Sequence, residues 1–458
     1  MRFRFDMLIR FAVENFLSFK GTVDFLMTAS ADEVCHQHHI VTKKDNKILK
    51  GSFLFGANAS GKSNFIKAID FAKDVVEEGL SRIDLDRKYF RIDPDYKKHP
   101  GVFQFDIFTE EEFYSYGFAI SYIDSSIQEE WLYKMGPDGN DECIFLRRKE
   151  NEKTTVKTDL KFDAEVSNKF KVYSDDITRM ENVLFLSDVS IRASSEQGFK
   201  HFKAVRHWFN KLMVIFPDSK SLSLNMMVRR DSYRKRLESM LNFFDTGIVS
   251  ISQIELAIDA VFNNTPSIVV ERIKSDFIKE LRQQDGYAIL NDGESVIEIN
   301  LKDNELYGKK IVSNHGNKSD FFEFIDESDG TKRLFDLIPL FFLVEDNSVI
   351  IIDEIDRSLH TKAVLEFINI FYNTARNNES QLIATTHDSN ILNLENIRRD
   401  EIWFIERNKD QSSRLFSLSQ FKARLGEDIE KDYILGRYGA IPIFNTILLE
   451  RGDVNDDE

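Results

Sequence analysis

The chain has 458 residues, of which 42% are hydrophobic and 30% charged, a composition typical of a folded protein large enough for more than one lobe. The net charge of −16 opposes non-specific attraction to the phosphate backbone of nucleic acids. Two cysteines give no disulfide framework, and no apolar run reaches the roughly 20 residues of a membrane-spanning helix. We therefore expect a cytoplasmic protein without membrane contact.

The first part of the chain predicts strands around one glycine-containing loop. Helical spacing of apolar residues runs from Asn64 to Leu80, directly after that loop, and Gly79 is a suitable end. Alternating or short apolar runs predict strands at residues 8–14, 23–27, 52–55, 102–108, 113–122, 144–147 and 183–186.

Residues 194–281 have helical spacing, which predicts a helical lobe inserted between two halves of one nucleotide-binding domain. After it, apolar patterns predict strands at 296–299, 311–312, 349–352 and 382–385, and helices at 334–343 and 364–372. The expected fold class is α/β: an ABC-type P-loop ATPase domain with a mixed sheet, N-terminal antiparallel strands and the inserted lobe. The expected divisions are 1–190, 191–290, 291–445 and an acidic tail, 446–458.

The segment GANASGKS, residues 56–63, matches the P-loop pattern between a predicted strand and a predicted helix. In that setting, backbone N–H groups and the helix N-terminus surround the phosphates of ATP, Lys62 adds a charge, and the Ser63 hydroxyl binds Mg²⁺. The residues expected to contact the nucleotide here are Gly56, Asn58, Ala59, Ser60, Gly61, Lys62, Ser63 and Asn64.

Two further strands are expected to end in catalytic groups. The apolar run 349–352 leads into Asp353, expected to hold Mg²⁺, and Glu354, expected to activate the attacking water. The run 382–385 leads to His387, which suits a sensor of the γ-phosphate that also orients Glu354. The predicted catalytic residues are therefore Lys62, Glu354 and His387.

A second anion site is expected where Ser328, Gly330 and Thr331 precede a helical run. Since the P-loop already holds phosphate in the same chain, this helix end makes most sense as a cap on ATP bound by another copy. The sequence thus predicts active sites formed between two chains.

The order of these motifs, with a long insertion after the P-loop, resembles ABC ATPases of the SMC, RecF and OLD-nuclease group. Residues 8–445 are similar to AAA15-type bacterial ATPases, the branch that includes RloA-type proteins and the ATPase of the PARIS phage-defence system. The segments that carry this likeness are NFLSFK, LNFFDTGI, ESDGTKRL, DEIDRSLH, TTHDSNIL, RRDEIWF and DYILGRYGAIP.

The resemblance implies a head-to-tail homodimer or larger homo-oligomer that hydrolyses ATP and controls an effector protein, often a nuclease encoded nearby, in response to phage. It also places Asp356 in the loop that links the two sites of a dimer. Glu327 and Asp329 depart from the leucine and glycine of transporter signatures. The magnesium-sensing glutamine has no clear position, and the weak candidates are Gln104, Gln128 and Gln197.

Alternatives stay open. The basic run 229–236 fits either a solvated helix face or a contact with nucleic acid, so a RecF-like DNA-binding ATPase is the second hypothesis. A scaffold in which ATP is structural is a third. Cys35, His36, His38 and His39 have metal-ligand chemistry, but no second cluster completes a tetrahedral site, which favours a solvated loop.

Overall fold

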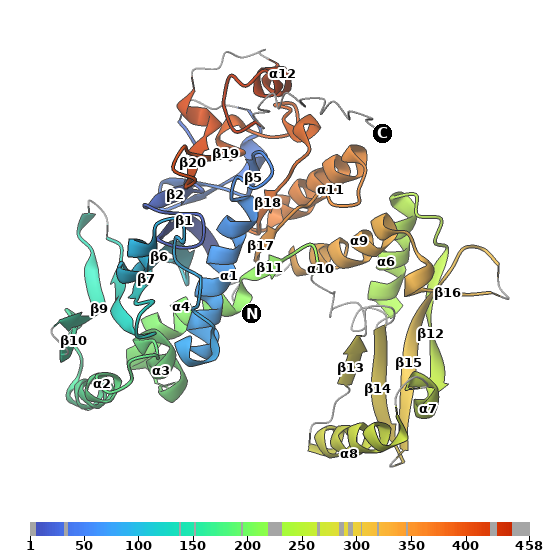
Figure 1. Cartoon of the computed structure of the whole chain (residues 1–458), viewed down its shortest axis with the longest axis horizontal. Coiled ribbons are helices and arrows are strands. Elements are labelled where there is room, and N and C mark those ends of the chain that lie inside the picture. Colours follow the sequence, from blue (N-terminus) through green and yellow to red (C-terminus); the bar gives the residue numbers. More distant parts are fainter. Residues whose placement is uncertain are drawn as a thin grey trace, which may run out of the picture.

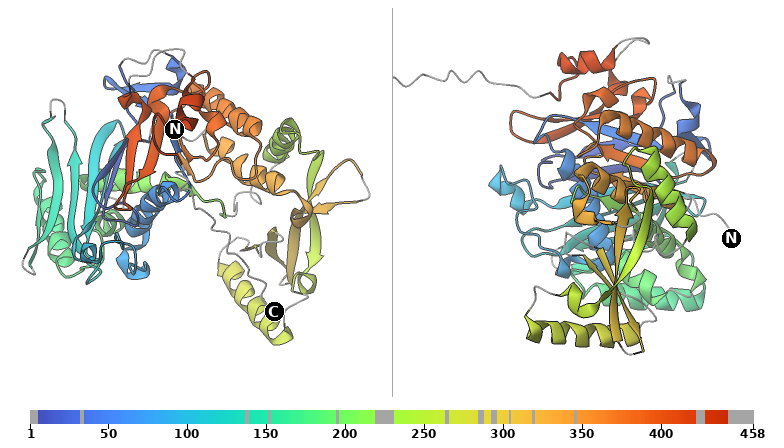
Figure 2. Two further views of the ribbon diagram at one scale, coloured as in Figure 1. Left: turned by 45° about the horizontal axis from the view of Figure 1, so that its top comes forward. Right: turned by 90° about the vertical axis from the view of Figure 1, so that its right-hand side faces the viewer.

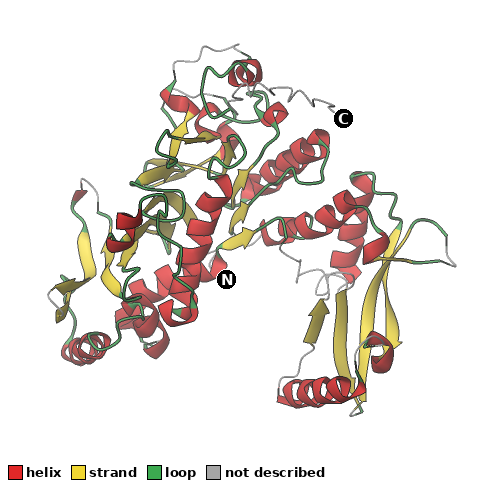
Figure 3. Ribbon diagram, in the orientation of Figure 1, coloured by secondary structure: helices red, strands yellow, loops and turns green. Residues whose placement is uncertain are grey.

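The structure is a computed structural model that describes residues 6–31, 35–136, 139–150, 153–193, 196–218, 231–262, 266–283, 288–291, 296–303, 305–317, 320–344, 347–421 and 428–441. The acidic tail predicted at 446–458 lies outside these residues. Within the described ranges, no helix is both long and apolar enough to cross a lipid bilayer. The fold is α/β and has the predicted mixed sheet and antiparallel N-terminal strands (Figures 1 and 3).

The central sheet has six strands in the order β11-β17-β18-β5-β19-β20. Their bounds are β5 Gly51–Phe55, β11 Met213–Ile215, β17 Val349–Ile352, β18 Gln381–Thr385, β19 Ile402–Arg407 and β20 Ser413–Ser417. All neighbours pair in parallel except β19 and β20. Strands β5, β17 and β18 are buried at every position, which explains why they are apolar without alternation.

A seven-stranded antiparallel sheet packs beside the central one, in the order β10-β9-β8-β7-β6-β1-β2. Its strands are β1 Asp6–Glu14, β2 Val23–Leu26, β6 Gly101–Thr109, β7 Glu112–Ile120, β8 Ile127–Lys134, β9 Glu142–Glu150 and β10 Lys153–Lys157. A separate hairpin joins β3 Ile40–Lys43 and β4 Asn46–Leu49. Gln381 of the central sheet links it to the seven-stranded sheet and to this hairpin, because its side-chain amide donates to the carbonyls of Leu8 and Leu49.

Helices fill the space between the two sheets and cover the outer face of the central one. Helices α1 Lys62–Glu78, α3 Phe185–Arg192 and α4 Lys200–Lys211 share one core with both sheets. Phe65 of α1 lies among aromatic rings of the N-terminal strands, with Phe11 and Phe25 about 5.5 and 5.3 Å from it. On the outer face lie α10 Leu340–Val344, α11 Thr361–Thr374 and α12 Ile429–Ile434. Helix α2 is Ala164–Ile177.

The strand predicted at 183–186 is wrong, because this segment begins helix α3. The buried carboxylate of Glu130 accepts hydrogen bonds from the backbone N–H groups of Phe185 and Leu186, at 2.6 and 2.9 Å. The N-terminal cap of α3 is thus supplied by a side chain from a distant strand, which accepts from backbone N–H groups of the first turn. The sequence near residue 185 contains no signal that predicts this cap. The helix predicted at 334–343 is also divided, into α9 Asp329–Leu337 and α10, with Pro339 between them.

The inserted lobe is not purely helical, as the spacing predicted, but mixed (Figures 1 and 2). Its helices are α6 Asp231–Phe243, α7 Ile258–Val261 and α8 Ser267–Gln283. Its five-stranded antiparallel sheet contains β12 Ser250–Ala257, β13 Ala288–Asn291, β14 Val296–Lys302, β15 Glu305–Asn314 and β16 Phe322–Glu323. The strands predicted at 296–299 and 311–312 therefore pair within this lobe.

Packing also favours different lobe boundaries from the expected 191–290. Helix α4 contributes Phe202, Trp208 and Phe209 to the core between the two large sheets, so it belongs with the N-terminal half. Leu237 and Leu241 of α6 instead pack against α9 in a separate core. We therefore propose that the inserted lobe runs from α6 to β16.

Candidate active site

Three neighbouring parallel strands bring the predicted catalytic groups to one edge of the central sheet. Strand β5 ends at the P-loop, β18 ends just before His387, and β17 ends at Asp353 and Glu354. Their order in the sheet is β17-β18-β5, with Ile352 opposite Ala384 and Thr385 opposite Leu54. Ligands of open parallel sheets bind at the carboxyl ends of the strands, and these residues all lie there.

The P-loop is held by serine hydroxyls from two distant segments. Ser413 on β20 donates to the carbonyl of Ser60 at 2.5 Å, and its oxygen lies 2.8 Å from the Ser18 hydroxyl. Asn64 in turn donates to Ser18 at 2.9 Å. Gly61 has φ of 115° and a Cβ there would collide with Ser413, so both the backbone conformation and the close approach require glycine. The loop is therefore fixed before any phosphate arrives.

Lys62 is buried at the start of α1 and turns back onto its own loop. Its ammonium group donates to the carbonyls of Gly56 and Ala57, at 2.6 and 3.1 Å, and lies 3.2 Å from His387 Nδ1. Burial lowers the pKa of Lys62 to about 8, although the nearby carboxylates at the end of β17 oppose this shift. A phosphate group would supply negative charge to an ammonium group that contacts two carbonyl oxygens and the ring nitrogen of His387.

The two carboxylates after β17 have different surroundings. Asp353 is buried, and its Oδ1 accepts from the Thr385 hydroxyl at 2.6 Å. Glu354 is partly exposed, with φ of 50°, and its backbone N–H donates to the same hydroxyl at 2.8 Å. Its Oε1 lies 3.5 Å from His387 Nε2. The backbone N–H of His387 donates to the carboxylate of Asp356, which fixes the histidine loop.

A cavity of about 530 Å³ lies among these groups. Its lining residues are Asn58, Ala59, Ser60, Gly61, Lys62, Ser63, Asn64, Glu354 and His387. The structure thus gathers the predicted catalytic residues and all the predicted P-loop contacts except Gly56 around one cavity, whereas Asp353, the predicted magnesium ligand, does not line it. Their individual roles in chemistry stay predictions.

The predicted signature residues do not line that cavity. Ser328 caps α9, because its hydroxyl accepts from the backbone N–H of Thr331 at 3.1 Å, and it is exposed. In Figure 1, α9 lies beside α6 of the inserted lobe, whereas the P-loop joins β5 to α1. A Cβ on Gly330 would come 2.8 Å from the carbonyl oxygen of Ser358, so this glycine allows α9 to approach the loop after Glu354.

Glu327, where the signature departs from that of transporters, is a buried structural carboxylate. It accepts a hydrogen bond from the Ser313 hydroxyl and lies 2.9 Å from His315 Nε2. Both partners belong to the end of β15 or the residue after it. Glu327 therefore connects the signature segment to the inserted lobe.

Arg333 is a site residue that the sequence did not indicate. It is buried on α9, and its Nη2 donates to the carbonyls of Asp353 and Glu354, both at 3.2 Å. Only its position one helical turn after Gly330 could have drawn attention to it. It connects the signature helix to the catalytic strand end within one chain.

A second cavity adjoins the P-loop and was also missed. It has a volume of about 320 Å³ and shares Ala59 and Asn64 with the first cavity. Tyr89, Arg87 and Arg91 supply an aromatic ring and two guanidinium groups to its wall. These side chains can stack on a nucleotide base, and the short run RKYFR at 87–91 was the available signal.

The structure supports neither a magnesium-sensing glutamine among the weak candidates nor a nucleic-acid contact through the described part of the basic run 229–236. Gln104 and Gln128 donate to neighbours on their own sheet and line neither cavity, and the side chain of Gln197 lies outside the description. Of the basic run 229–236, Arg229 and Arg230 also lie outside it. On α6, Arg234 pairs with Asp231 at 2.7 Å and Arg236 lies over the ring of Phe342.

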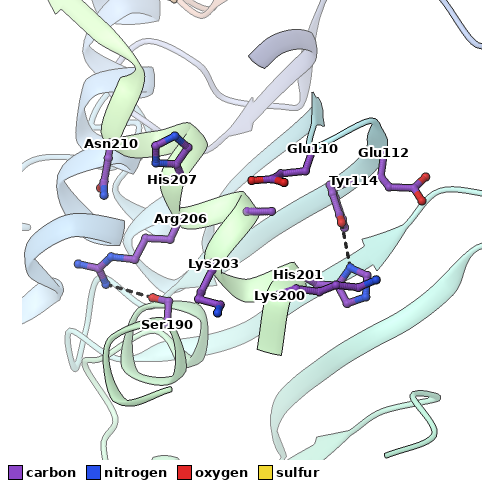
Figure 4. A pocket seen from close by; sticks show the side chains of 11 residues that line it. Glu110, Glu112, Tyr114, Ser190, Lys200, His201, Lys203, Arg206, His207 and Asn210 are labelled. Atoms are coloured by element: carbon purple, nitrogen blue, oxygen red, sulfur yellow. Dashed lines mark hydrogen bonds between the residues drawn. The ribbon is translucent and has the colours of Figure 1, made fainter. Parts of the chain in front are cut away.

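A cavity larger than these two lies away from the nucleotide residues, between α3, α4 and the β6–β7 turn (Figure 4). Its volume is about 680 Å³. Its wall carries Lys200, Lys203 and Arg206 of α4 and the acidic turn residues Glu110 and Glu112, and Arg206 points toward Ser190. Because acidic and basic side chains both line this cavity and the predicted catalytic residues lie elsewhere, its size alone does not identify a phosphate site.

Comparison with known proteins identifies one family. Residues 52–393 match AAA_21, described as AAA domain, putative AbiEii toxin, Type IV TA system. No curated protein matches the chain.

Solved structures of Smc heads show a faint likeness. The SMC head domain from Thermotoga maritima is 14% identical over 90% of this chain and 98% of that one, with a TM-score of 0.36. An Smc head domain bound to the C-terminal domain of ScpA, derived from Pyrococcus furiosus, is 14% identical over 94% and 99%, with a TM-score of 0.35. At such scores, the strand order and the motifs remain the basis of the fold assignment.

Proposed function

We propose, since this chain belongs to the AAA_21 family of AAA domains, that it binds ATP with Mg²⁺ and hydrolyses it in sites shared by two copies arranged head to tail. The observation that carries this proposal is the separation of two phosphate-binding elements in one chain. The P-loop, Glu354 and His387 surround a cavity, while the capped helix end at Ser328 is exposed outside it. A second copy can bring its own Ser328 to that cavity.

In the proposed reaction, water attacks the γ-phosphate in line with the leaving oxygen. Glu354 accepts the proton of that water, and His387, 3.5 Å from it, holds the carboxylate toward the phosphate. Lys62 leaves the carbonyls of its own loop and binds the phosphate oxygens. The backbone N–H groups of the P-loop and the partner's α9 stabilise the charge on the transferring group.

Ser63 and Asp353 suit magnesium, because both offer the oxygen ligands that this ion prefers. The Thr385 hydroxyl donates to Oδ1 of the buried Asp353, which fixes the direction of this carboxylate beside Glu354. When bound, the ion neutralises negative charge on the phosphates. The base and ribose would extend into the adjoining cavity beside Tyr89.

A mixing experiment tests whether the site is shared. Lys62→Ala removes the phosphate-binding lysine, and Ser328→Arg obstructs the helix end, so each variant alone should be inactive. When equal amounts are mixed, heterodimers carry one site with both residues intact, and about a quarter of the wild-type rate should return, because a two-fold dimer has two equivalent sites. No recovery, or full-speed hydrolysis by a strictly monomeric wild type, would contradict the shared site.

For the biological role, we propose a sensor or regulator of an effector, of the nuclease type, in bacterial anti-phage defence. Two observations support this role: the likeness of several segments to AAA15-type ATPases, and the family description, which names a toxin of a type IV TA system. Purification of the wild type and of a Glu354→Gln variant from bacteria, followed by mass measurement of bound proteins, should recover the same effector. A Glu354→Gln strain that resists phage as well as the wild type would contradict a role for turnover.

A further inference from the structure

Three histidines outside the nucleotide site gather in the loop that leads into β3. His36, His38 and His39 each offer a ring nitrogen, and these nitrogens all lie within 4.8 Å of one another. His36 has the left-handed backbone conformation, with φ of 47° and ψ of 51°, which turns the chain sharply before the short helical turn 37–39. The sequence favoured a solvated loop, yet the three rings converge.

Groups from the far end of the chain orient two of these rings. His39 Nδ1 lies 3.1 Å from both carboxylate oxygens of Glu401, and its ring stacks on Tyr372 with centroids 3.4 Å apart. The Tyr372 hydroxyl donates to the same carboxylate at 2.9 Å. With Nδ1 donating to Glu401, Nε2 of His39 is the nitrogen that can bind a metal.

His36 is oriented in the corresponding way. Its Nε2 lies 2.9 Å from the backbone carbonyl of Leu394, to which it can only donate. Its Nδ1 is therefore left for a metal. Metal-binding histidines regularly donate their second nitrogen to a carboxylate or a backbone carbonyl, which fixes the tautomer and the ring direction. His36 has the backbone-carbonyl partner and His39 the carboxylate partner. The side chain of His38 is exposed and can turn toward the other two rings.

We propose that His36, His38 and His39 form a binding site for one zinc-like divalent transition metal ion. Imidazole nitrogens suit Zn²⁺ and its neighbours, whereas Mg²⁺ and Ca²⁺ prefer oxygen ligands, so the site is chemically distinct from the predicted magnesium site. Three protein ligands leave a fourth tetrahedral position for water, because the exposed His38 opens the site to solvent.

Nearby cations limit the affinity of this site. Lys50, Arg376 and Arg398 lie close enough to act on the rings electrostatically. Arg398 is paired with Asp400, at 2.8 and 2.7 Å, so its charge is largely compensated. Lys50 donates to the carbonyl of Ala375. The carboxylate of Asp400 acts on His39 in the opposite direction to these cations.

The ion would stabilise the loop 36–39, whose rings are already hydrogen-bonded to the C-terminal half of the ATPase domain. Both groups that orient the rings come from the segment between β18 and β19. Leu394 follows the loop that carries His387, and Glu401 directly precedes β19. None of the three histidines lines the nucleotide cavity. The inferred role is structural, and it stands whether or not the proposed ATP hydrolysis is correct.

Calorimetric titration with zinc sulfate tests the proposal. The protein should carry no polyhistidine tag, be stripped with a chelator and contain millimolar Mg²⁺ but no nucleotide. We expect one saturable Zn²⁺ site per chain and a rise in melting temperature on binding. His38→Ala removes an exposed side chain and leaves the fold intact. It should weaken Zn²⁺ binding at least about tenfold, because even mutations of residues that only orient metal ligands lower metal affinity by that factor.

His99→Ala is the matched control, because His99 is also exposed but lies outside the cluster. It should bind Zn²⁺ as the wild type does and show the same rise in melting temperature. Absence of saturable binding by the wild type, equal binding by His38→Ala, or equal loss in His99→Ala would each overturn the proposal.

Discussion

Replacing Glu354 with glutamine isolates the predicted catalytic step, because the change leaves the surrounding contacts intact. The bonds to Thr385 and Arg333 use only the backbone of Glu354, at 2.8 and 3.2 Å, and glutamine preserves both. What changes is the carboxylate 3.5 Å from His387. Loss of a general base costs about 10²–10⁴ in rate, which corresponds to about 3–5 kcal/mol of barrier at 1.36 kcal/mol per factor of ten.

Phosphate release at saturating ATP and Mg²⁺ measures that loss, and equilibrium titration with a fluorescent ATP analogue should show binding at least as tight as in the wild type. Light scattering should then detect an ATP-bound dimer that persists. Glu395→Gln makes the same charge change on an exposed loop and should leave all three measurements unchanged. Hydrolysis by Glu354→Gln at the wild-type rate would refute the assignment of Glu354 as the base.

Three further variants or conditions probe the rest of the site. Burial lowers the pKa of Lys62 to about 8, so without nucleotide this lysine loses its proton above pH 8, whereas bound phosphates raise the pKa and keep it protonated. ATP affinity, measured by calorimetric titration, should therefore be constant below pH 8 and fall above it by up to about tenfold per pH unit. Tyr89→Ala should weaken ATP binding by about 1–3 kcal/mol through lost stacking, while Tyr89→Phe keeps the affinity. Arg333→Met leaves the carbonyls of Asp353 and Glu354 without their buried donor, so urea unfolding should show a loss of about 1–3 kcal/mol, together with a lower kcat.

The sequence was informative wherever the chemistry depends on fixed spacing. The P-loop pattern requires glycine and lysine at set positions between a strand and a helix, and the structure has β5 and α1 there. The apolar runs before Asp353 and His387 predicted buried strands, because strands covered on both faces lose the polar alternation, and the structure pairs them in parallel. Parallel neighbours then share one functional edge, so local patterns alone brought these groups together.

The sequence was uninformative wherever a partner lies far along the chain. Glu130 caps α3 from another strand, and the segment was therefore mistaken for a strand. The histidine cluster was assigned to solvent because Glu401, which orients His39, is 362 residues away. Ser413 supports the P-loop across 353 residues in the same way. Local spacing carries no information about such contacts.

The surroundings of α9 suggest how the two proposed sites of a dimer would influence each other. The Ser328 end of this helix is exposed, and in the proposed dimer it would meet the nucleotide of the partner, while Arg333 on the same helix donates to the carbonyls of Asp353 and Glu354 in its own chain. If α9 moved as a rigid body when phosphate bound at its N-terminus, Arg333 would move with it and change the position of the other active site. Glu327 extends the same connection to the inserted lobe through Ser313. Each chain would then report the nucleotide of its partner both to its own Glu354 and to a lobe that an effector can bind.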